Sequence, residues 1–158
     1  MPRILIVAYG NPLRSDDGVA WRAGDALESK FPPSEVEILR AHQLAPEIAE
    51  QACRSECVIF IDAAAILSSL PGEIRAEEIH SENLDHNDST RFSHVVSPQA
   101  VIALAATLYD AKLKAILVTV TGENFEHGES LSPQVAPALP VLVARIEGIV
   151  RSLLREKA

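Results

Sequence analysis

Apolar runs alternate with segments of helical periodicity along the chain. Residues 4–9 and 57–63 are nearly continuous apolar runs, which are typical of strands covered on both faces. Residues 36–41 and 115–120 predict two more strands, and the looser alternation at 73–79, after Pro71-Gly72, predicts an edge strand. The pattern therefore predicts about five strands.

Helices are expected between these strands. Ser15 is positioned to cap a helix that starts near Asp16, and Pro46 suits the first turn of a short helix. Ser97-Pro98 predicts a helix through Tyr109, and Ser132-Pro133 a last helix to about Leu154. This order predicts an α/β fold: a doubly wound, mostly parallel sheet flanked by helices on both faces.

Length and composition set broad limits. A chain of 158 residues predicts one domain, residues 1–158, and 47% hydrophobic content is enough for a core. No apolar run reaches the ~20 residues of a membrane span, and no secretory signal is recognisable, so we expect a cytoplasmic protein without a membrane partner. The net charge of −8, with no basic stripe, argues against nucleic acid as a partner.

Three polar residues follow strands or precede a helix where a binding crevice is expected. Asp17 lies in the loop after the first strand, Asp62 ends the third, and His94 lies just before Ser97-Pro98. In a doubly wound sheet the loops at the carboxyl ends of the strands form the crevice. Two carboxylates and an imidazole there would suit a divalent metal ion.

These candidates differ in strength. Asp16 and Asp17 are consecutive, so helical geometry lets only one of them face the crevice easily, and both also suit a helix N-terminus. Asp62 follows five apolar residues, where an unpaired carboxylate is costly. His94 alone is a weak signal, and His42 and His127, in loops after the second and last strands, are further candidates.

Several familiar chemistries are absent. The glycines around residues 10–18 form neither a GxGxxG nor a P-loop pattern. There is no HExxH helix, and Ser15 is not in a G-x-S-x-G elbow. Nucleotide binding, zincin-type proteolysis and serine hydrolysis are therefore not indicated.

Four stretches resemble the hydrogenase maturation endopeptidases. They are the segment Gly10-Asn11-Pro12-Leu13-Arg14-Ser15-Asp16-Asp17-Gly18-Val19, the apolar strand ending in Asp62, Phe92-Ser93-His94 with Ser97-Pro98, and the stretch from Gly122 through Val135. Their order and spacing cover nearly the whole chain. Two departures are Ala20, where many members have glycine, and residues 41–47, where many have a glycine-rich segment.

The resemblance implies a specific activity. Such an enzyme removes the C-terminal extension of the nickel-loaded large-subunit precursor of a nickel–iron hydrogenase, and its Ni²⁺ arrives with the substrate. Asp17, Asp62 and His94 would contact that metal, while Gly10, Asn11 and Asp16 would shape the loop that presents Asp17. The loop with His42 would help to recognise the precursor, and His42 could add a ligand.

The chemical step and two rival functions stay open at this point. The metal could activate water, or Asp17 or Asp62 could act as a catalytic base. One rival is a non-catalytic nickel-binding module. The other is a phosphoacceptor receiver domain, which also places acids after the first and third strands; the lysine it needs after the last strand is missing.

Overall fold

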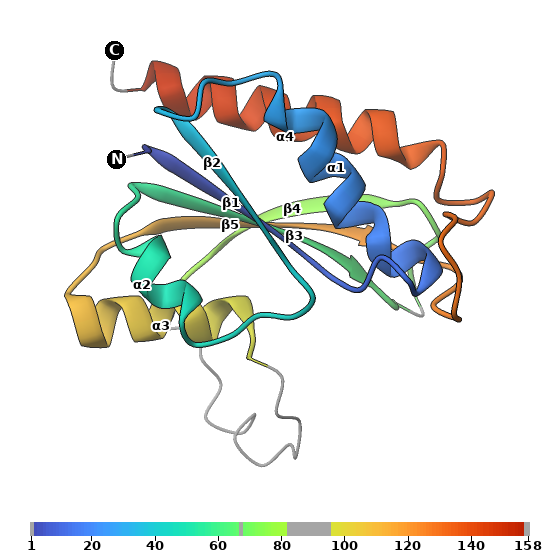
Figure 1. Cartoon of the computed structure of the whole chain (residues 1–158), viewed down its shortest axis with the longest axis horizontal. Helices are drawn as coiled ribbons and strands as arrows, with labels where there is room; N and C mark the ends of the chain where they lie inside the picture. The colour runs from blue at the N-terminus through green and yellow to red at the C-terminus, as the bar shows by residue number, and fades with distance from the viewer. Residues whose placement is uncertain (1, 67, 82–95, 157–158) are drawn as a thin grey trace.

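A five-stranded sheet forms the centre of the molecule. The computed structural model describes residues 2–66, 68–81 and 96–156. The strands are β1 (Ile4–Tyr9), β2 (Val36–Ala41), β3 (Cys57–Ala64), β4 (Ile74–Ile79) and β5 (Lys114–Thr121). Their order is β2-β1-β3-β5-β4, and all neighbours are parallel except β4, which runs antiparallel to β5 at one edge (Figure 1).

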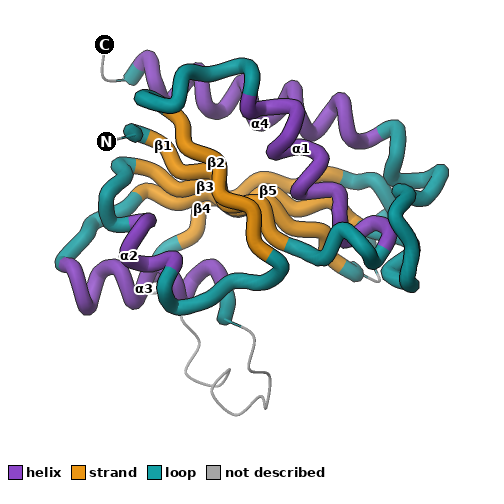
Figure 2. The backbone as a smooth tube through the Cα atoms, in the orientation of Figure 1, coloured by secondary structure: helices purple, strands orange, loops and turns teal. Residues whose placement is uncertain are grey.

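Helices cover both faces of this sheet. The helices α1 (Val19–Glu28) and α4 (Ala138–Arg155) lie on one face, and α2 (Ile48–Ala52) and α3 (Pro98–Tyr109) on the other, as Figure 2 shows. Alternate residues of β1 serve the two layers: Ile4 and Ile6 belong to the α1–α4 core, while Leu5 and Val7 belong to the α2–α3 core. The expected doubly wound sheet with one edge strand is thus confirmed.

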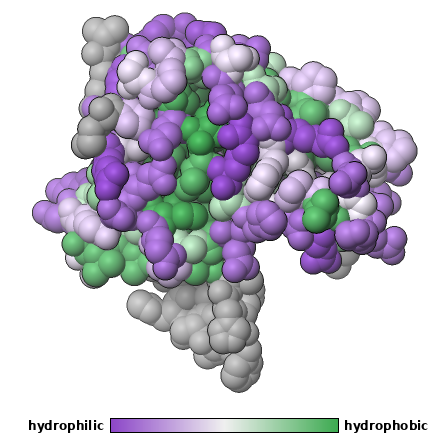
Figure 3. All heavy atoms as spheres, viewed as in Figure 1, coloured by the Kyte–Doolittle hydropathy of each residue, from purple (hydrophilic) through white to green (hydrophobic). Residues whose placement is uncertain are grey.

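The outer surface is mostly hydrophilic on the face seen in Figure 1. In space-filling form, apolar side chains show there as a strip down the middle and as further patches at the lower left and on the right, among hydrophilic ones (Figure 3). In the part of the chain that the structure describes, no helix is both long and apolar enough to cross a membrane.

Two helix starts differ from the sequence prediction. Ser15 does not cap a helix: its φ is +52°, a short 3-10 turn covers Ser15–Gly18, and α1 begins only at Val19. The last helix begins at Ala138 rather than at Ser132-Pro133. Both serines have other partners, because the Ser15 hydroxyl donates to the Glu126 carbonyl and the Ser132 hydroxyl to Asp16.

Candidate functional site at the carboxyl edge of the sheet

The strand order identifies where a site is expected. The chain passes from β1 to β2 on one side and then to β3 on the other, so the order reverses at β1. In open α/β sheets a ligand crevice forms at the carboxyl ends of the strands flanking such a reversal. Asp17 follows β1 and Asp62 lies near the end of β3, so both carboxylates belong to this edge.

Asp17 is held in place by the loop that precedes it. The Asn11 backbone N–H donates to its carboxylate at 2.7 Å, and the Asn11 side chain accepts from the Leu13 N–H at 2.9 Å. Gly10 has φ +144°, and a Cβ atom at that position would collide with the Asp17 carbonyl. This close approach explains why glycine is needed at position 10.

Asp62 is a half-buried carboxyl group in a negative environment. Burial is the main cause that raises its pKa to about 7, and the charge of Asp17 raises it further. The Tyr9 hydroxyl and the Ala63 N–H hydrogen-bond to Asp62 and partly oppose this shift. Among the described residues no basic side chain lowers the pKa of Asp62, so the charge of Asp17 acts on it without a compensating cation.

Asp16 has the opposite environment. It is fully buried and accepts from the backbone N–H groups of Glu123, Asn124 and Ser132 and from the Ser132 hydroxyl, at 2.7–2.8 Å. Burial alone would raise the pKa of Asp16, but these hydrogen bonds hold it below its usual value. Asp16 therefore joins two loops and does not share the crevice with Asp17.

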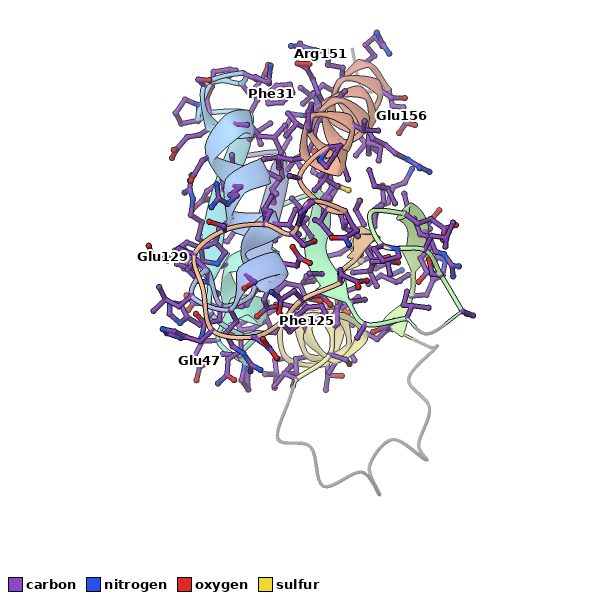
Figure 4. All side chains as sticks on the ribbon, turned by 90° about the vertical axis from the view of Figure 1, so that its right-hand side faces the viewer. Phe31, Glu47, Phe125, Glu129, Arg151 and Glu156 are labelled. Atoms are coloured by element: carbon purple, nitrogen blue, oxygen red, sulfur yellow. The ribbon has the colours of Figure 1, made fainter. Side chains whose placement is uncertain are left out.

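Further bonds attach residues 122–132 to the opening loop, and we call this pair of segments the Asp16 clamp. The Ser15 N–H donates to the Gly128 carbonyl and the Gly128 N–H to the Leu13 carbonyl, both at 2.8 Å. The Arg14 guanidinium donates to the Phe125 carbonyl at 3.1 Å. Figure 4, which looks onto this edge, shows the loop with Phe125 and Glu129 crossing the start of α1.

His94 lies outside the described residues, so its place relative to the two carboxylates stays a prediction. The helix that follows it is described: α3 begins at Pro98, and the Ser97 hydroxyl caps it by accepting from the Ala100 N–H at 3.1 Å. Asp62 alternates with Val58 and Phe60 of the α2–α3 core, so it faces the same side of the sheet as α3. The segment carrying His94 thus leads into the helix layer on the face of Asp62.

The other two histidine candidates have separate surroundings. His42 is exposed, and its ring meets the Trp21 ring edge-on, with 5.3 Å between the centroids. His127 is exposed in the loop of the clamp. Within residues 2–66, 68–81 and 96–156, no group of three or more His, Cys, Asp or Glu side chains is placed to hold a metal ion. Neither histidine therefore completes the Asp17–Asp62 pair.

The donor set nevertheless suits a divalent cation that comes with a ligand. Two carboxylates of like charge, one of them partly removed from water, are stabilised when a cation neutralises them.

The residue that sequence reasoning missed is Tyr9, which contacts Asp62. A signal was present, because alternation along residues 4–9 places Tyr9 on the face of Leu5 and Val7, at the end of the strand.

Comparisons with known proteins agree with this description. No protein-family model matches the chain. The hydrogenase 2 maturation protease of Escherichia coli (strain K12) is 29% identical over 168 residues, with 98% of this chain and 97% of that protein covered.

Solved structures show the same fold. The hydrogenase-maturating endopeptidase HybD from E. coli has a TM-score of 0.73 at 24% identity, covering 95% of this chain and 93% of its own. The maturation protease HycI from Thermococcus kodakarensis KOD1 has a TM-score of 0.75 at 18% identity, covering 94% and 92%. The resemblance predicted from the motifs is thus confirmed over almost the full length.

Proposed function

We propose that this chain is a hydrogenase maturation endopeptidase, which cleaves a C-terminal extension from the precursor of a hydrogenase large subunit. The observation that carries the proposal is the Asp17–Asp62 pair at the reversal of strand order, within a chain that matches maturation proteases from end to end. A receiver domain has less support, because β4 is an antiparallel edge strand.

We further propose that the client is a nickel–iron hydrogenase and that its Ni²⁺ is part of the substrate. Asp17, Asp62 and His94 would contact this ion while other positions stay free for ligands from the precursor. Carboxylate and imidazole donors together suit a borderline divalent ion. The uncompensated negative charge at Asp17 and Asp62 supports a cationic substrate centre.

The same two acids are proposed to assist hydrolysis. Asp62 lies at the carboxyl edge of the sheet close enough to Asp17 to be affected by its charge, and we propose that it accepts a proton from an attacking water. Asp17 is fixed by the Asn11 N–H, so its free oxygen has a defined direction.

We propose the cytoplasm as the compartment, which the two free thiols, Cys53 and Cys57, support.

Cleavage of nickel-loaded precursor tests this function. Wild type should cleave it, and Asp17→Ala, Asp62→Ala and His94→Ala should each lower the rate by about 10²–10⁴-fold, the usual contribution of a positioned acid or base. Asp25→Ala is a matched control, because Asp25 is an exposed acid that pairs with Arg40 on the surface. Full activity in all three site variants would contradict the proposal, and binding of precursor without cleavage would favour a nickel-binding module.

A further inference from the structure

Tyr9 and Asp62 lie side by side on neighbouring strands. In the parallel register of β1 and β3, Ala8 pairs with Ile61, so the next residues along the two strands are Tyr9 and Asp62. Both point to the α2–α3 side of the sheet, where the Tyr9 ring packs against the core. Its hydroxyl lies within hydrogen-bonding reach of the Asp62 carboxylate.

This bond acts against a repulsion. Asp62 faces the negative charge of Asp17, which favours turning the Asp62 carboxylate away. The Tyr9 hydroxyl and the Ala63 N–H are two donors that hold it in place. Groups of this kind, which orient a ligand without contacting the metal, commonly contribute 10–100-fold to affinity or activity.

We propose that Tyr9 is a positioning residue, whose hydroxyl holds Asp62 in the orientation in which Asp62 and Asp17 meet the substrate's metal together. This inference rests on the function proposed above. Tyr9 contacts neither the metal nor the scissile bond, and its effect passes through Asp62. The substitution Tyr9→Phe keeps the ring and its packing and removes only the phenol hydroxyl. It therefore tests the role of that hydroxyl alone.

The chain contains a matched control. It has two tyrosines, and the second, Tyr109, is 46% exposed at the end of α3. Tyr9→Phe and Tyr109→Phe each remove one phenol hydroxyl, but only the first removes a hydroxyl bonded to Asp62. A general effect of the substitution would appear in both variants, whereas the positioning role predicts an effect at residue 9 alone.

Two measurements on the full chain test the role. In steady-state cleavage of nickel-loaded precursor, Tyr9→Phe should lower kcat/KM about 10–100-fold. In calorimetric titration with Ni²⁺ alone, Tyr9→Phe should weaken Kd by a similar factor, with Tyr109→Phe like wild type. In the Asp62→Ala background Tyr9→Phe should have no further effect on either quantity, because its target is gone.

The outcomes separate this inference from the proposed function. If wild type cleaves the precursor and Tyr9→Phe matches it in kcat/KM and nickel Kd, the positioning role is overturned while the function stands. If wild type does not cleave but binds nickel, the function fails and the titration alone decides the role of Tyr9. Failure of wild type to cleave and to bind nickel overturns both. If Tyr9→Phe lowered activity by the same factor in wild type and in the Asp62→Ala background, Tyr9 would not act through Asp62.

Discussion

Asp16 and Asp17 are neighbours in sequence, but they belong to two regions with opposite electrostatics. In the Asp16 clamp, one buried carboxylate receives four hydrogen bonds, and its pKa lies below the usual value. In the Asp17–Asp62 pair, burial and then the charge of Asp17 raise the pKa of Asp62 to about 7. A carboxylate whose oxygens all accept hydrogen bonds within the protein stabilises the fold. A carboxylate with few such hydrogen bonds is available to bind a ligand.

The largest expected contrast is in stability. Asp16→Ala removes a buried acceptor and leaves the N–H groups of Glu123 and Asn124 without a partner, so we expect a loss of about 3–5 kcal/mol in the free energy of unfolding. Asp17→Ala removes one hydrogen bond, from Asn11, and also a repulsion with Asp62, so we expect a change within about 1 kcal/mol. Urea unfolding of both variants measures this difference.

The activities of the two variants should follow the reverse order. At a temperature where Asp16→Ala is still folded, it should retain more cleavage activity than Asp17→Ala, because Asp16 contacts the loop of residues 122–132 and not the crevice. Equal losses of stability in the two variants, or a folded Asp16→Ala protein that is as inactive as Asp17→Ala, would remove the distinction between the regions.

Two glycines give a second, smaller contrast. Gly10→Ala would place a Cβ atom against the Asp17 carbonyl at φ +144°, so we expect a loss of about 2–3 kcal/mol and a displaced Asp17 with reduced cleavage. Gly148 lies in α4, where a Cβ atom would have no neighbour within 4 Å, so Gly148→Ala should instead stabilise by about 0.5–1 kcal/mol. Thermal unfolding and the cleavage assay measure both; an unaltered Gly10→Ala protein would show that the loop presenting Asp17 tolerates displacement.

The sequence predicted some of these features because their causes are local. The pattern of apolar residues predicted β1 and β2 to the residue, and strand order placed Asp17 and Asp62 on one edge. The partners of Asp16 could not be predicted, because Ser132 is 116 residues away along the chain. The same long-range bond explains why Ser132, which has the pattern of a helix cap, does not start α4.

A further expected effect is a pH dependence of stability that has opposite signs in the two regions. The pKa of Asp62 is about 7 in the folded chain and 3.8 as the reference value, so between these pH values the folded state holds a proton that the unfolded state has released. Stability therefore falls as pH rises through this window, and the destabilisation is complete above about pH 7.

Asp62→Asn should accordingly gain stability over wild type as pH rises from 4 to 7, by on the order of 1–2 kcal/mol because Asp62 is only partly buried. Urea unfolding across this range, with a chelator present, measures the gain. In an Asp17→Asn background the gain should shrink, because the charge of Asp17 is one of its causes.

Asp16→Asn should behave oppositely: the pKa of Asp16 is lowered in the fold, so its stabilisation is present above the reference pKa and is lost as pH falls. The Asp16 defect should therefore be greatest at neutral pH, where the benefit of Asp62→Asn is also greatest, and pH profiles of the same sign for both variants would contradict the assignment of the two acids to different roles.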